Sequence, residues 1–158
     1  MNVRVLLARA FPDADRTGCQ ESDCMWRVVG LGAAVLDGDS LAVQNRASCD
    51  CIVTYVLRRT LHVALAEIKG GNMSPGNIKR KMEHSIPTIR AILQMIPRRG
   101  ISQVKMLCLV VSDFTRSSAM ALDGLRIMAF GRNLRVYTEL CGHHINEWQD
   151  FYQTVDTP

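Results

Sequence analysis

The chain has 158 residues, of which 47% are hydrophobic and 22% charged, and its formal net charge is +4. This composition predicts one globular domain over residues 1–158 and excludes disordered, collagen-like and fibrous proteins. No apolar run approaches the roughly 18 to 20 residues that cross a bilayer, so we expect no membrane-spanning role. The short apolar run before Arg9 has no signal-peptide core, and a cytoplasmic location is therefore expected.

The cysteines support that expectation only if they stay reduced, since a chain of this length needs no disulfide to stabilise its core. Disulfides are the less favoured interpretation. A Cys-x4-Cys pair and a Cys-x-Cys pair suggest zinc as an alternative, although the second spacing is tighter than the usual two to four residues. One more cysteine lies in an apolar run and is expected to be a small buried side chain. The six are Cys19, Cys24, Cys49, Cys51, Cys108 and Cys141.

The first half of the chain is rich in predicted strands. The polar segment Asp13–Asp23 lacks periodicity and is interpreted as a loop or short helix. A hairpin is expected between the runs Trp26–Leu36 and Leu41–Val43, because Asp37-Gly38-Asp39-Ser40 between them is typical of a turn. The β-branched and aromatic run Cys51–Leu57 predicts a strand, and Leu61–Lys69 predicts another that ends at two glycines.

The second half alternates helical and strand patterns. Apolar residues recur at three- and four-residue spacings from Ile78 to Ile96, which predicts an amphipathic helix that Pro87 should kink or split. The run Val104–Val111 predicts a buried central strand, Ser117–Met128 a shorter helix, and Leu134–Thr138 a late strand. The order of these elements indicates an α/β domain with a mixed β-sheet.

Charge is unevenly distributed along the chain. Between residues 70 and 135 there are eleven Lys or Arg against three acids, a net +8, whereas residues 136–158 carry four acids and no Lys or Arg. The densest patch is Lys79-Arg80-Lys81. Such a block suits a polyanion such as nucleic acid, although a solvated helix face gives the same pattern and is favoured on charge alone.

Two carboxylates and an ammonium are predicted to meet in the sheet. Side chains alternate along a strand, so Glu67 and Lys69 share a face, and an antiparallel neighbour can bring Asp50 opposite them. Two buried carboxylates need a positive partner, and Mg²⁺ suits a site with few protein oxygens because substrate phosphates and waters complete its shell. The alternative is a rim Asp beside a solvent-facing Glu–Lys pair.

The segments Cys49-Asp50 and Ala66-Glu67-Ile68-Lys69-Gly70, followed by a basic amphipathic helix, resemble the PD-(D/E)XK nuclease superfamily. The resemblance implies a restriction-endonuclease-like mixed sheet flanked by helices. It implies that Asp50 and Glu67, helped by the Ile68 carbonyl, bind the metal, and that Lys69 orients or deprotonates the attacking water.

Other family positions match less closely. The acid of the family's first helix is best matched by Glu21 and next by Asp23, and Cys49 stands where the family has a proline. Lys79 and Lys81 occupy the helix on which the family carries phosphate contacts.

The expected function is a Mg²⁺-dependent nuclease, with Mn²⁺ as a substitute, that hydrolyses phosphodiester bonds in nucleic acid, DNA more than RNA. Because duplex cleavage needs two active sites, a homodimer or larger complex is plausible. The first alternative is a non-catalytic nucleic-acid-binding or assembly subunit that retains the fold. A zinc-stabilised regulatory protein is the second.

Overall fold

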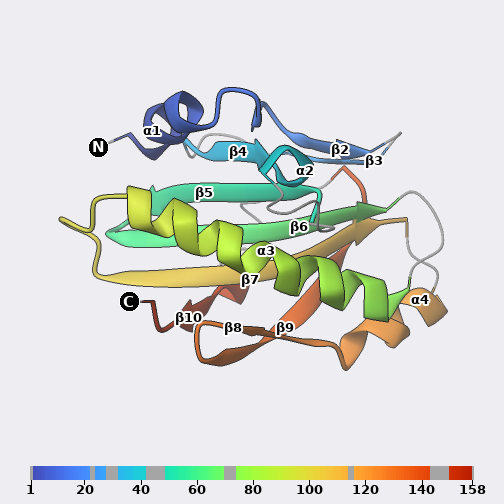
Figure 1. Ribbon diagram of the computed structural model, residues 1–158. Coiled ribbons are helices and arrows are strands. Elements are labelled where there is room, and N and C mark those ends of the chain that lie inside the picture. Colours follow the sequence, from blue (N-terminus) through green and yellow to red (C-terminus); the bar gives the residue numbers. More distant parts are fainter. Residues whose placement is uncertain are drawn as a thin grey trace.

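The computed structural model describes residues 2–21, 24–27, 32–41, 49–69, 74–113, 116–142 and 150–157. Within these residues a large mixed sheet follows the order β1-β4-β5-β6-β7-β9-β8, with β10 beside β7, and helices lie against it (Figure 1). Its strands are β1 (Asp15–Arg16), β4 (Ala34–Asp37), β5 (Cys51–Leu57), β6 (Thr60–Lys69), β7 (Gln103–Ser112), β8 (Arg126–Ala129), β9 (Arg132–Glu139) and β10 (Gln153–Val155). A separate hairpin consists of β2 (Cys19–Glu21) and β3 (Cys24–Trp26). The helices are α1 (Val3–Ala10), α2 (Gly38–Leu41), α3 (Pro75–Met95) and α4 (Arg116–Asp123).

The centre of the sheet changes from antiparallel to parallel pairing. Strands β4, β5 and β6 pair antiparallel, whereas β7 pairs parallel with both β6 and β9. A parallel neighbour requires a crossover, and α3 supplies it between β6 and β7. The expected α/β mixed sheet flanked by helices is therefore present.

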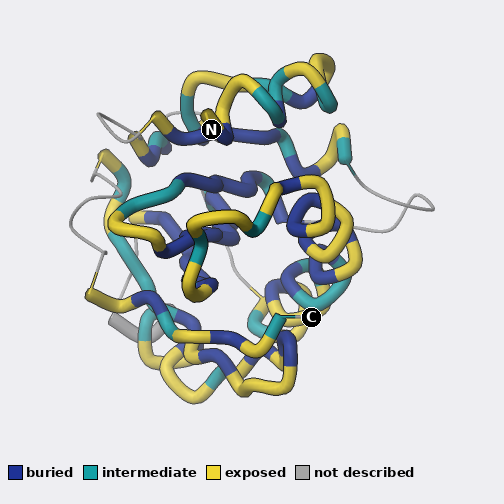
Figure 2. The backbone as a smooth tube through the Cα atoms, turned by 90° about the vertical axis from the view of Figure 1, so that its left-hand side faces the viewer, coloured by how far each residue is buried: buried dark blue, intermediate teal, exposed yellow. Residues whose placement is uncertain are grey.

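The two faces of the sheet bury different sets of residues, as the alternation along β6 shows. Val63 and Leu65 join the core cluster under α1 and α3, whereas Ala64 and Ala66 join the cluster under the β2–β3 hairpin. The central strands are almost wholly buried (Figure 2). Side chains at odd positions of β6 consequently point toward α3, which decides where Glu67 lies.

Helix α3 has the amphipathic pattern that the sequence predicts, but it runs unbroken through Pro87. The Ser74 side chain caps its first turn by accepting a hydrogen bond from Asn77 N, and Pro75 occupies the first position, where no N–H is needed. Pro87 is exposed, so the Glu83 carbonyl, which loses its helical partner, lies where solvent can hydrate it. Of the predicted kink or split, the split is therefore wrong, since the helix continues from Pro75 to Met95.

Two disulfides fasten the β2–β3 hairpin to the sheet, and the expectation of reduced cysteines is wrong for these four residues. Cys19 is bonded to Cys51, and Cys24 to Cys141. The proposed zinc set is overturned as well, because Cys19, Cys24 and Cys51 are in disulfides and Cys49 is not. All six sulfurs belong to residues that are buried or half-buried, which spacing along the chain does not reveal.

Several predicted elements need correction. The Asp37–Ser40 cluster begins a helical turn, α2, and β4 pairs with β5 instead of with a strand at 41–43, of which residues 42 and 43 lie outside the described residues. The helix predicted over Ser117–Met128 ends at Asp123 and is followed by β8. Segment Asp13–Asp23 contributes β1 and β2, and α1 was not predicted. Among the described helices, none has the length and apolarity needed to cross a bilayer.

Candidate active site

Strand register brings Asp50 and Glu67 together, as predicted. Cys51 pairs with Ala66, so Asp50, one residue before β5, comes opposite Glu67 on β6. The Asp50 N–H donates to Glu67 Oε2 at 3.2 Å, and the Ile68 N–H donates to Asp50 Oδ2 at 2.8 Å. Each carboxylate is thus held by the backbone of the other strand, which fixes their separation without a flexible linker.

Two lysines approach this acid pair from different elements. Lys69 lies two positions after Glu67 on the same face of β6, and its Nζ is 3.0 Å from Glu67 Oε1. Lys81 projects from the first half of α3, forms an ion pair with the same Oε1, and lies 3.7 Å from Asp50 Oδ1. The predicted convergence of Asp50, Glu67 and Lys69 is present, with a second ammonium added.

A hydrogen-bond relay fixes α3 against the start of β5. The Ser85 hydroxyl donates to the Lys81 carbonyl at 2.8 Å and accepts the Cys49 N–H at 2.9 Å. The helical turn that bears Lys81 is therefore tied to the residue before Asp50. This connection positions the Lys81 side chain over the acids and explains why a residue fourteen positions from Glu67 reaches it.

Burial makes the charges of the site strongly interdependent. The Glu67 side chain is 0% exposed, against 22% for Asp50, 18% for Lys81 and 29% for Lys69. Burial and then the Asp50 charge raise the pKa of Glu67, which the two lysines oppose. Burial alone would lower the pKa of Lys81, but its contact with Glu67 and the charge of Asp50 leave that pKa raised. Two acids and two ammoniums balance in charge.

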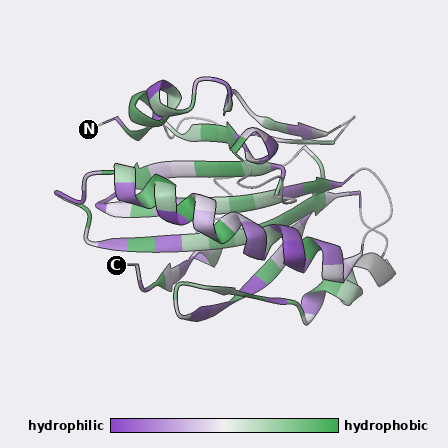
Figure 3. Ribbon diagram, viewed as in Figure 1, coloured by the Kyte–Doolittle hydropathy of each residue, from purple (hydrophilic) through white to green (hydrophobic). Residues whose placement is uncertain are grey.

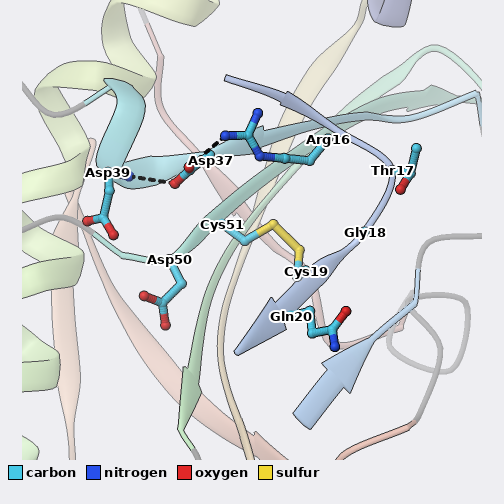
Figure 4. Close-up of a pocket in the computed structure, with 9 residues that line it drawn as sticks. All are labelled: Arg16, Thr17, Gly18, Cys19, Gln20, Asp37, Asp39, Asp50 and Cys51. Atoms are coloured by element: carbon cyan, nitrogen blue, oxygen red, sulfur yellow. Dashed lines mark hydrogen bonds and ion pairs between the residues drawn. A yellow bond between two sulfur atoms is a disulfide. The ribbon is translucent and has the colours of Figure 1, made fainter. Parts of the chain in front are cut away.

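A cleft of about 530 Å³ opens beside Asp50 (Figure 4). One wall is the segment from Arg16 to Gln20, and the other carries Asp37, Asp39 and Asp50. The Asp37 carboxylate already has structural partners, since it accepts hydrogen bonds from the Arg16 side chain and from the Asp39 N–H. The Asp39 carboxylate lies on the same side of the cleft as that of Asp50. Sequence reasoning missed Asp39 because it treated the Asp-Gly-Asp-Ser signal only as a turn.

The remaining predicted site residues lie away from the acid pair, contact it only through the backbone, or have side chains outside the described part of the structure. Lys79 is 48% exposed and pairs with Glu83 at 3.7 Å, away from the acids. Ile68 contacts Asp50 through its N–H, and its side chain belongs to the core of the opposite face. Glu21 ends β2, but its side chain falls outside the described part of the structure, as does all of Asp23.

The donors that do converge suit a hard cation. Among described residues no group of three His, Cys, Asp or Glu side chains could hold a metal, and the acids that converge with the lysines are the pair Asp50 and Glu67. Mg²⁺ is commonly bound by one or two carboxylates, with waters and substrate phosphates as further ligands. The ammonium that already lies between the two acids indicates that this position favours positive charge.

Comparison of the chain with protein-family models, with curated proteins and with solved structures finds no match in any of the three.

Proposed function

We propose that the protein is a Mg²⁺-dependent nuclease with a restriction-endonuclease-like fold, which hydrolyses phosphodiester bonds in DNA. The antiparallel β4–β5–β6 meander, the crossover helix α3 and the parallel strand β7 support this fold. They are the elements that the resemblance to the PD-(D/E)XK superfamily implies around an Asp and a Glu-x-Lys triplet.

The observation that carries the proposal is the meeting of Asp50, Glu67 and Lys69 at the carboxyl end of β6. Asp50 and Glu67 would hold the cation, which supplies Lewis-acid charge that lowers the pKa of water and neutralises phosphate oxygens. Lys69 is 29% exposed and projects from the same face, where its ammonium can orient a water and stabilise the negative charge that develops on the phosphate.

Positive charge near this site is concentrated on the first half of α3. Lys79 and Arg80 are exposed there, and hydrophilic residues gather at the end of the helix that lies beside the carboxyl end of β6 (Figure 3). Two arginines from the end of the basic block have acidic partners: Arg132 lies 3.3 Å from Asp156, and Arg135 2.9 Å from Asp123. The start of α3 lies beside the acid pair and is the surface that we expect to contact backbone phosphates.

The test compares metal-dependent cleavage by the wild-type protein with cleavage by variants of the acid and lysine residues of the site. Plasmid, linear duplex and single-stranded DNA and RNA are incubated with Mg²⁺ or Mn²⁺ and with wild type, Glu67→Gln or Lys69→Met. We expect each substitution to lower the cleavage rate by about 10²-fold or more, because it removes a charge required in the transition state. The control is Asp123→Asn, which removes an exposed carboxylate that pairs with Arg135 away from the acids. Cleavage that persists unchanged in Glu67→Gln contradicts the proposal.

A second candidate is a nucleic-acid-binding subunit that retains the fold without catalysis. The observation that favours it is the charge balance of the site, in which two ammoniums already neutralise two acids. Salt-sensitive binding, weakened by Lys79→Ala, together with no cleavage in either metal, is the result that this candidate predicts.

A further inference from the structure

Lys81 lies between the two acids, where a cation shared by them would have to sit. Its ammonium forms an ion pair with Glu67 Oε1 and is 3.7 Å from Asp50 Oδ1, whereas Lys69 contacts the Glu67 oxygen alone. We propose that Lys81 is an internal counter-ion that competes with the divalent cation and that moves to the substrate phosphates when the cation binds. This inference rests on the proposed function.

Charge balance makes the competition necessary. With both lysines in contact, Asp50 and Glu67 are neutralised, so a dication added to them would leave a net charge of +1 around a completely buried carboxylate even when the nearby Asp39 carboxylate is counted. Such an excess is unfavourable in a weakly screened interior, and a like charge close to the dication is repelled. One ammonium must therefore move away, and we expect it to be that of Lys81, because it occupies the position between the two acids.

The side chain of Lys81 is built for such a movement, whereas its backbone is not. Ser85 holds the Lys81 carbonyl at 2.8 Å, but the ammonium is at the end of a flexible four-carbon stem and is 18% exposed. Withdrawal toward solvent leaves it on the first half of α3, the segment that also carries the exposed Lys79 and Arg80, where backbone phosphates would offer a new partner. Cation entry and polyanion binding should then strengthen each other.

The experiment measures Mn²⁺ binding by isothermal titration calorimetry, without nucleic acid, on wild type, Lys81→Met, Lys81→Arg and Lys79→Met. Loss of the competing ammonium should tighten Mn²⁺ binding on the order of tenfold in Lys81→Met. Lys81→Arg keeps a positive charge and should stay close to wild type, as should Lys79→Met, whose lysine contacts Glu83 and not the acids. Thermal midpoints of the variants check that each is folded.

A second measurement tests where the ammonium goes. Wild-type Mn²⁺ affinity should rise in the presence of a non-cleavable phosphorothioate oligonucleotide, and Lys81→Met should lose most of that rise. Equal or weaker Mn²⁺ binding by a folded Lys81→Met overturns this inference and leaves the proposed nuclease standing. Absence of Mn²⁺ binding in wild type and in all variants overturns both. Tighter Mn²⁺ binding in Lys81→Met, but not in Lys81→Arg or Lys79→Met, supports Lys81 as the internal counter-ion.

Discussion

Asp39 shows how a residue outside the predicted set can influence the site. Its backbone N–H is held by Asp37 at 3.0 Å, which leaves its carboxylate facing the cleft beside Asp50. Burial raises the pKa of Asp39, and the charges of Asp50 and Asp37 raise it further, against the opposite effect of the lysines. A third negative charge this close should attract a cation even without binding it directly.

Replacing this charge should weaken metal binding modestly. Asp39→Asn is expected to reduce Mn²⁺ affinity by about threefold, because the carboxylate is exposed and its field is partly screened by water. Calorimetric titration at low ionic strength measures the effect, and added salt should reduce it. Asp123→Asn is the matched control, since Asp123 is 71% exposed and pairs with Arg135 elsewhere. An unchanged affinity in Asp39→Asn would show that the carboxylate plays no part.

At this scale, the sequence predicts what depends on strand periodicity and misses what depends on tertiary placement. Glu67 and Lys69 share a face because side chains alternate, and Asp50 follows from an antiparallel neighbour. Lys81 was expected to contact phosphate, and its ion pairs with the acids depend on how α3 packs across β6, which no local pattern encodes. Asp39 was missed because a turn and a helical first turn use the same residue types.

Among the elements, β5, β6 and the segment before β10 meet in a buried aromatic group. The rings of Tyr55 and His62 stack with centroids 4.7 Å apart, and Tyr152 packs edge-on against His62 at 4.9 Å. Burial lowers the pKa of His62, the Thr60 carbonyl opposes this, and the Lys105 charge lowers the pKa further. Burial also raises the pKa of both tyrosines, so no charged partner among these rings favours a protonated His62.

This group predicts an acid-sensitive fold. Because the folded pKa of His62 lies below the unfolded value of 6.5, its contribution is fully present above that value and is lost as pH falls through the folded pKa. His62→Phe should flatten the fall in the free energy of unfolding between pH 7.5 and pH 5 by about 1 kcal/mol, measured by urea denaturation. A wild-type slope in His62→Phe contradicts the prediction.

Element prediction succeeds where periodicity is long and fails where a turn lacks its usual residues. The runs that form β5, β6, β7 and α3 are seven residues or longer, and all were predicted. Strand β8 was merged into the preceding helix, although β9 was predicted, because the turn between them uses Phe130 with φ 46° before Gly131 with φ 74°. Positive φ at both positions is typical of a type I′ turn, for which Phe is an unusual first residue.

Across the whole molecule, the disulfides join parts that are distant in sequence. Cys24–Cys141 spans 117 residues and connects β3 to the turn after β9, while Cys19–Cys51 spans 32 residues and ends beside Asp50. Together they hold the β2–β3 hairpin over the second core cluster, which includes Trp26. A long closed loop restricts the unfolded chain strongly, so the longer bridge should contribute more to stability.

Removing the longer bridge should lower the free energy of unfolding by about 2–5 kcal/mol. Chemical denaturation of a Cys24→Ala/Cys141→Ala variant measures the loss, and a dithiol reductant, which breaks both bridges, should produce a larger loss in wild type. A variant that lacks both bridges is the control, because the reductant should not affect it. Equal stability with and without the reductant in wild type would contradict the prediction.

The pairing of cysteines could not be predicted at this scale, since it depends on which strands lie together. Neither 19 with 51 nor 24 with 141 follows a local spacing rule, and the expected reduced state depended on a cytoplasmic location. That location stays a prediction, against which two disulfides weigh because such bonds are characteristic of oxidising compartments. The mixed α/β class of the domain, by contrast, followed from alternating strand and helix signals.

Two strands pair with the same edge of β7. Its residues Cys108–Val111 pair with β9, and its residues Val104–Met106 pair with β10. During synthesis on the ribosome, the first part of this edge stays uncovered until residues 153–155 emerge. A nascent protein would therefore display this unpaired segment of β7 while the roughly forty residues between β7 and β10 are added, and chaperones or premature self-association would compete for it.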